Sequence, residues 1–203
     1  MIHLNGNVLC AIDVETTGLK AGHHEIVQVC FLPLDGDLKP RRDVVPFDLN
    51  LKVEFEDRID WDAFRVTKIN FFKHQQTAMD KYEAADLFDG WVQKLKLPER
   101  KRISPLAHNW IFDAGFIKDW LGPTSFETVI DGRYRDTMTL ALGINDIYDR
   151  NNEPIPFPKV NLSYIASQLK IAHENAHSAL GDCVVTAEVY KGLLLKGYLD
   201  AAA

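Results

Sequence analysis

Two carboxylates one residue apart stand at the end of an apolar run near the start of the chain. Asp13 and Glu15 follow the apolar residues 8–12 and lead into Thr-Thr-Gly, a pattern that predicts a buried strand running into a turn. Because side chains at positions i and i+2 of a strand point to the same face, these two carboxylates lie side by side. Like charges so placed repel each other and are costly to remove from water, and a divalent cation between them would offset both costs. The alternative is a solvated strand end without a ligand, so a metal site requires further ligands elsewhere in the chain.

A third acidic residue, Asp113, occupies the first turn of a predicted helix. It ends the segment H-N-W-I-F-D at residues 108–113, in which Asn109 is expected to cap the helix through its side chain. Apolar residues surround Asp113, and a carboxylate among them is expensive unless it is paired. Asp113 is therefore either a site ligand or a solvent-facing carboxylate that interacts with the helix dipole.

The last candidate residues, His177 and Asp182, are five positions apart. On one continuous helix their side chains would diverge by about 140°, so they share a site only if His177 precedes the helix and Asp182 lies in its first turn. Ser178 as the N-cap gives this arrangement, with a helix from Asp182 to about residue 195. His173 is expected to be a loop or helix-end histidine and not a second catalytic one.

A mixed α/β fold would position these residues, with an antiparallel meander first and alternating strands and helices after it. After the opening strand, the predicted strands are residues 25–32, 47–53, 103–107 and 126–130. The predicted helices are residues 84–95, 109–121, one opened by Asp136 as N-cap, 161–169 with Asn161 as N-cap, and 182–195. Residues 151–158 contain three prolines and are expected to form a loop.

An aromatic segment at residues 61–72 is interspersed with basic side chains. Such a composition can stack nucleic-acid bases, but burial in the core is the expected fate of Phe64, Phe71 and Phe72.

Length and composition limit the classes of protein. The chain has 203 residues, 46% of them hydrophobic, which is enough for one domain over residues 1–203. No apolar run approaches the ~20 residues of a membrane helix, and the first residues lack the pattern of a signal peptide. Three cysteines (Cys10, Cys30 and Cys183) are expected to be buried thiols in a reducing compartment, so a cytoplasmic location is expected. The net charge of −6 argues against a protein that coats long nucleic acid by charge alone.

Three motifs occur in order: D-V-E-T-T-G at residues 13–18, H-N-W-I-F-D at 108–113 and H-S-A-L-G-D at 177–182. Together they resemble the DEDDh family of 3′–5′ exonucleases, the DnaQ-like group that includes polymerase proofreading subunits, RNase T and oligoribonucleases. The resemblance spans about residues 8–195. It implies an RNase H-like fold, in which helices flank a mixed five-stranded sheet. Cys183 stands where the family often has alanine, a small-for-small change.

The resemblance also implies roles for individual residues. Four carboxylates would bind two divalent metal ions, Mg²⁺ or Mn²⁺: Asp13 as the bridging ligand, Glu15, Asp113 and Asp182. Hard carboxylate oxygens suit these cations. His177 would be the general base that takes the proton from the attacking water, a task for a side chain that ordinarily titrates near neutral pH. Glu15 is assigned to catalysis as well as to metal binding. The residues expected to meet the terminal nucleotide are Thr16, Thr17, Leu19 and Asn109.

The predicted function is a metal-dependent exonuclease that releases nucleoside 5′-monophosphates from a 3′ end, with single-stranded DNA slightly preferred to RNA. It would serve proofreading or nucleic-acid processing, and proofreading would require a separate DNA polymerase partner. One alternative is a nucleic-acid-binding or polymerase-associated module with weak catalysis, although none of the four acidic positions or the histidine is missing. The other is a metal-dependent hydrolase of a smaller phosphodiester.

Overall fold

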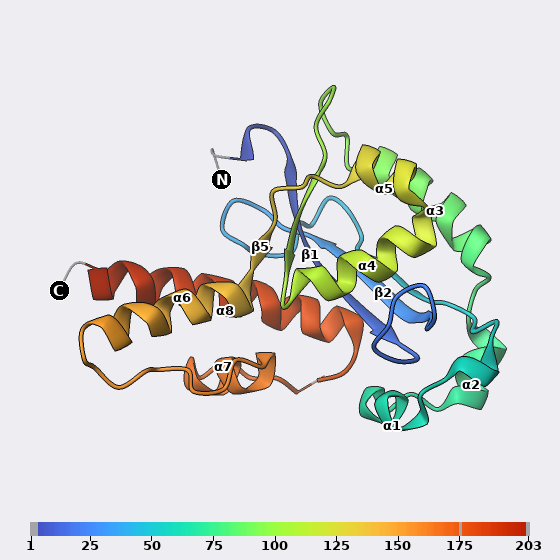
Figure 1. Ribbon diagram of the computed structural model, residues 1–203. Helices are drawn as coiled ribbons and strands as arrows, with labels where there is room; N and C mark the ends of the chain where they lie inside the picture. Colours follow the sequence, from blue (N-terminus) through green and yellow to red (C-terminus); the bar gives the residue numbers. More distant parts are fainter. Residues whose placement is uncertain (1–3, 175, 202–203) are drawn as a thin grey trace.

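The computed structural model describes residues 4–174 and 176–201 and shows a five-stranded mixed sheet between two groups of helices (Figure 1). The strand order is β3-β2-β1-β4-β5, with antiparallel pairing on the β2 and β3 side of β1 and parallel pairing on the β4 and β5 side. The strands are β1 Val8–Thr16, β2 Ile26–Pro33, β3 Phe47–Asn50, β4 Ile103–Ala107 and β5 Arg135–Asp136. The predicted fold class, a meander followed by β/α units, is confirmed.

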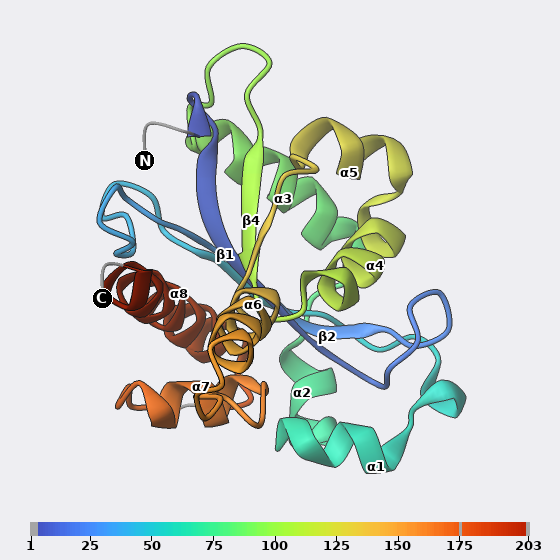
Figure 2. The ribbon, with the colours of Figure 1, turned by 60° about the vertical axis from the view of Figure 1, so that its left-hand side comes forward.

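The helices pack on both faces of this sheet. They are α1 Trp61–Phe64, α2 Phe71–Thr77, α3 Lys81–Lys94, α4 Trp110–Leu121, α5 Pro123–Val129, α6 Thr137–Arg150, α7 Leu162–Gln168 and α8 Ala179–Ala201, with short 3₁₀ turns at Glu56–Arg58 and Arg65–Thr67. Figure 2 shows α3, α4 and α5 on one side of the sheet, and α6, α7 and α8 on the other. Among the described residues, no helix is both long and apolar enough to span a membrane. The expected single domain over residues 1–203 includes residues 1–3 and 202–203, which lie outside the described residues. The expectation that the N-terminal residues 1–7 form no signal peptide likewise includes residues 1–3.

Alternate side chains of β1 face the two helical layers. Cys10, Ile12 and Val14 pack in a core with α3 and α4, whereas Leu9 and Ala11 pack in a second core with α8. Because strand side chains alternate, Asp13 and Glu15 continue the set that faces α8. Both carboxylates therefore lie where the apolar packing between β1 and α8 ends.

The predicted fifth strand at residues 126–130 is wrong. The chain forms helix α5 there, and Pro123 occupies its first turn, where a fixed φ suits a helix and the missing N–H needs no partner. Only Ile130 reaches the sheet, as a parallel bridge to Ile103. The fifth strand is the two-residue β5 further along the chain.

Three of the predicted caps are confirmed. The side chains of Asp136 and Asn161 accept hydrogen bonds in the first turns of α6 and α7, and the Ser178 hydroxyl accepts from the backbone N–H of Gly181 at 3.2 Å. The element boundaries are less accurate: α3 and α8 each begin three residues before the predicted start, and β3 ends three residues earlier. As predicted, residues 151–158 form no helix or strand.

The predicted side-chain cap by Asn109 is wrong. Asn109 has a left-handed backbone (φ +72°), and its side chain makes no capping hydrogen bond. Instead, Oδ2 of Asp136 accepts from the backbone N–H of Trp110 at 2.7 Å. One carboxylate at the end of β5 therefore serves the first turns of both α4 and α6.

The aromatic segment divides between the core and the surface. Phe64 and Phe71 are buried, as predicted, but Phe72 is 79% exposed, so its predicted burial is wrong. Neighbouring residues on a helix point about 100° apart, and α2 can therefore turn only one of the two adjacent phenylalanines toward the core.

Candidate active site

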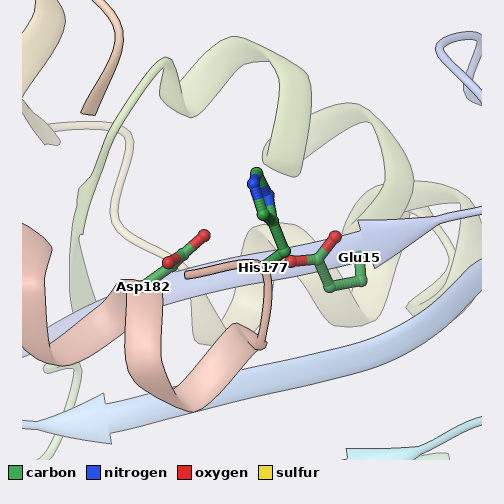
Figure 3. A group of neighbouring side chains, drawn as sticks. All are labelled: Glu15, His177 and Asp182. Carbon is green, nitrogen blue, oxygen red and sulfur yellow. The ribbon is translucent and has the colours of Figure 1, made fainter. Parts of the chain in front are cut away.

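Glu15, His177 and Asp182 place their ligand atoms within 4.8 Å of one another. They come from the end of β1, the loop before α8 and the first turn of α8, and Figure 3 shows the three side chains around one shared space. The loop position of His177 and the helical position of Asp182 are the arrangement that their five-residue spacing requires.

Asp13 and Asp113 lie in the same charged group. Burial, followed by the charges of Asp113, Asp182 and Glu15, raises the pKa of Asp13 well above its usual value. Asp113 is only 3% exposed, and its Oδ1 accepts from the backbone N–H of Val14 at 3.1 Å. Burial raises the pKa of Asp113, with the Val14 hydrogen bond acting in the opposite direction. Asp113 is therefore not a solvated helix-end carboxylate but is fixed against β1.

The cluster has an excess of negative charge. Burial and the charge of Asp182 raise the pKa of Glu15 to about 7. Within residues 4–174 and 176–201, no lysine or arginine forms an ion pair with Asp13, Glu15, Asp113 or Asp182. Carboxylate oxygens with one imidazole form a donor set that suits a hard divalent cation, which would supply the missing positive charge.

His177 has an unusual backbone conformation, with φ at +70°. A non-glycine residue in the left-handed region is uncommon, and such residues cluster at functional sites. Figure 3 shows the imidazole standing out from this loop between Asp182 and Glu15, with its ligand atom within 4.8 Å of theirs.

The loop after β1 is held by the two threonines that were predicted to meet the substrate. The Thr16 hydroxyl donates to the carbonyl oxygen of Gly18 at 2.6 Å, and the Thr17 hydroxyl accepts from the backbone N–H of Glu25 at 2.9 Å. Both side chains are buried. Their hydroxyls thus shape the loop, and their contact with a nucleotide stays a prediction.

Two other predicted substrate residues present exposed side chains. Leu19 is 74% exposed just after the loop glycine, and Asn109 is exposed where α4 begins. The β1–β2 loop and α4 lie against each other at Ala21 and Gly115. The contact is so close that a Cβ added at Gly115 would lie 3.2 Å from the Cβ of Ala21.

The sequence reasoning missed one polar contact to the site. Nε2 of His173 lies 2.5 Å from Oδ1 of Asp182. His173 is in a loop, as expected, but it touches a carboxylate of the cluster. The only sign of this contact in the sequence is the second histidine in H-E-N-A-H at residues 173–177. That pattern does not reveal which residue each histidine contacts.

Comparison with known proteins identifies the family. The sequence model of the RNase T family, whose description is exonuclease, matches residues 10–190. A search of curated proteins finds no match.

Solved structures share the fold at low sequence identity. Cell-death related nuclease 4 (CRN-4) aligns with a TM-score of 0.71 and 17% identity, over 94% of this chain and 64% of that one. The zinc-bound complex of E. coli exonuclease I with single-stranded DNA aligns with a TM-score of 0.72 and 17% identity, over 94% of this chain and 41% of that one. A 3′-exonuclease that recognises the histone mRNA stem-loop aligns with a TM-score of 0.67 and 13% identity, over 94% of this chain and 64% of that one.

This chain thus spans less than two thirds of each of these three proteins. Their likeness to it shows the fold, and the family match covers all the acidic residues and the histidine of the cluster. The chain belongs to the RNase T exonuclease family, that of the DnaQ-like 3′–5′ exonucleases.

Proposed function

We propose that this chain is a metal-dependent 3′–5′ exonuclease that releases nucleoside 5′-monophosphates from the end of a single strand. The observation that carries the proposal is the cluster of four carboxylates and His177, drawn from β1, α4, α8 and the loop before α8. The excess of negative charge in this cluster is unfavourable for the protein alone and favourable for binding divalent cations.

Two divalent cations, Mg²⁺ or Mn²⁺, fit the donor set. The residues that would hold them are Asp13, proposed as a ligand common to both cations, Glu15, Asp113 and Asp182. Bound cations would polarise the attacking water and the scissile phosphate and would stabilise the departing oxygen. The raised pKa values of Asp13 and Glu15 support this assignment, since both carboxylates are buried beside other carboxylates, where a cation would offset the cost of their charge.

His177 is the proposed general base. Its imidazole lies beside Glu15 and Asp182, where it can take a proton from a water that attacks phosphorus. Attack breaks the bond between phosphorus and the 3′ oxygen of the preceding nucleotide. The shortened strand then ends in a 3′-hydroxyl, and the released nucleotide keeps its 5′-phosphate.

The terminal nucleotide is proposed to lie against the loop after β1 and the start of α4. There the backbone and side chains of Thr16 and Thr17 would meet the nucleotide, Leu19 would pack on its base, and Asn109 would also contact it. The exposure of Leu19 supports this placement, since an apolar side chain in solvent is available for stacking.

Single-stranded DNA is the proposed substrate ahead of RNA. Exonuclease I was solved with single-stranded DNA, whereas the histone mRNA enzyme recognises RNA, so both strands belong in the test. The proposed setting is the reducing cytoplasm, which the three buried, free cysteines support. A proofreading role would additionally need a DNA polymerase partner.

The test uses 5′-labelled DNA and RNA of one sequence, with Mg²⁺, Mn²⁺ or EDTA. Asp13→Asn is the variant expected to be inactive. Asp86→Asn makes the same substitution at an exposed carboxylate of α3 and is the matched control, expected to stay active. A metal-dependent ladder that shortens from the 3′ end, lost only in Asp13→Asn, is the expected result. Strand binding without a ladder would indicate the binding module instead, and cleavage confined to dinucleotides would indicate a hydrolase of small phosphodiesters.

A further inference from the structure

A chain of polar contacts leads from α7 to the carboxylate cluster through His173. Nδ1 of His173 lies 3.1 Å from the hydroxyl of Ser163, and Nε2 lies 2.5 Å from Oδ1 of Asp182. The side chains of His173 and Asp182 are only 10% and 14% exposed. The contact is therefore largely shielded from water, unlike a surface ion pair.

The donors and acceptors along this chain are mutually consistent. An ionised carboxylate only accepts hydrogen bonds, so Nε2 of His173 must carry the proton that is donated to Asp182. A neutral imidazole then has an acceptor at Nδ1, and the Ser163 hydroxyl can donate to it. Ser163 thus selects the tautomer of His173 that can hold Asp182.

We infer that His173 is a positioning residue that orients the carboxylate of Asp182 for cation binding. The inference rests on the proposed function, in which Asp182 is a metal ligand. The bond to His173 fixes one carboxylate oxygen and leaves the second for a cation. Carboxylates that bind metals are commonly held by such outer hydrogen bonds, whose loss typically lowers metal affinity by about 10- to 100-fold.

The two histidines of H-E-N-A-H therefore have separate tasks. His177 has its ligand atom in the shared space with Glu15, whereas His173 bonds Asp182 and is itself held from α7. His173 acts through Asp182 and needs no contact with the substrate.

The test is a Mn²⁺ titration of the purified full-length protein without substrate, followed by electron paramagnetic resonance. His173→Ala is expected to weaken Mn²⁺ binding about tenfold or more. His173→Gln keeps an N–H donor close to the position of Nε2 and is expected to restore most of the affinity. Ser163→Ala should weaken binding by a smaller factor. Ser167→Ala, which removes another hydroxyl of α7, should leave it unchanged.

The outcomes separate this inference from the proposed function. If the unmodified protein binds no Mn²⁺, the proposed metal-dependent function fails and the inference fails with it. If Asp182→Asn loses Mn²⁺ while His173→Ala binds it as tightly as the unmodified protein, or more tightly, the inference alone is overturned. Should His173→Ala not fold, Ser163→Ala decides: weaker Mn²⁺ binding supports the inference, and unchanged binding overturns it.

Discussion

Carboxylates near the two ends of β1 are in opposite electrostatic situations. Near the start of the strand lies Asp131, from the loop between α5 and β5, which accepts from the Asn7 side chain at 2.6 Å and from the guanidinium of Arg133 at 3.0 and 3.1 Å. These bonds, chiefly those from Arg133, hold the pKa of Asp131 well below its usual value. Near the end of the strand, burial and neighbouring carboxylates raise the pKa of Asp13 and Glu15.

The difference separates a carboxylate that stabilises the fold from one that binds a ligand. Asp131 has its counter-charge in the same chain, two residues away, and needs nothing from solution. The cluster around Asp13 has carboxylates and histidines but no paired lysine or arginine in the part of the chain that the structure describes. Its positive charge must come from outside, and the four predictions below follow from this contrast.

Asp13→Asn should have the largest effect, a loss of turnover of about 10³-fold or more, since several kcal/mol of transition-state stabilisation would depend on the cations that Asp13 is proposed to hold. The folded state without metal should not be weakened, because one repelling charge is removed. Single-turnover kinetics on a labelled strand and denaturant unfolding in EDTA measure the two effects. An active Asp13→Asn protein would show that the cluster is not catalytic.

His177→Asn should lower the rate by about 10²- to 10⁴-fold, the usual contribution of a general base. Because the carboxylates remain, Mn²⁺ affinity should fall far less than in Asp13→Asn. Parallel rate measurements and Mn²⁺ titrations separate the two roles. Equal losses of rate and of metal affinity would make His177 a metal ligand instead of a base.

Without metal, the protein should become less stable as pH rises. The native pKa of Glu15, about 7, lies above its ordinary 4.5, so between these values the native state binds more protons than the unfolded chain does. The free energy of unfolding therefore falls as pH rises from 4.5 to 7, by up to about 3 kcal/mol for this group.

Denaturant unfolding in EDTA at pH 5 and pH 7.5 measures this slope, with Glu15→Gln as the control that should flatten it. Added Mn²⁺ should restore stability at the higher pH, since it binds the ionised carboxylates. Stability that rises with pH in EDTA over this window would contradict the account.

Asp131→Asn should have the smallest effect on activity, and its effects should be the reverse of those of Asp13→Asn: stability is lost and catalysis is kept. It should cost about 1–3 kcal/mol of unfolding free energy, because the bonds from Arg133 and Asn7 lose their charged acceptor. The folded variant should keep its turnover and its Mn²⁺ affinity. A loss of metal binding here would break the proposed distinction between the two ends of the strand.

The sequence is sufficient to predict the site where the repeat of a strand or a helix determines which way a side chain points. The alternation in β1 was enough to place Asp13 and Glu15 on one face, and the five-residue spacing of His177 and Asp182 was enough to require a loop followed by a helix. The N-caps of α6 and α7 were also readable, since a cap bonds within its own first turn.

Sequence-based predictions fail where the hydrogen-bond partner of a residue lies far along the chain. Asn109 has the residue type of a cap, yet Asp136 supplies the cap at Trp110 from another strand. His173 bonds Asp182 across a loop, and no local pattern reveals that contact. The sequence of α5 resembles a strand because it contains apolar and β-branched residues, and its clearest local sign of a helix is Pro123 in the first turn.

The most direct measurement is the anomalous diffraction of Mn²⁺ in crystals of the protein grown with a short single strand. The account predicts two Mn²⁺ peaks about 4 Å apart among Asp13, Glu15, Asp113 and Asp182, at the 3′ end of the strand. Mn²⁺ bound elsewhere in the crystal, with none between these carboxylates, would contradict it.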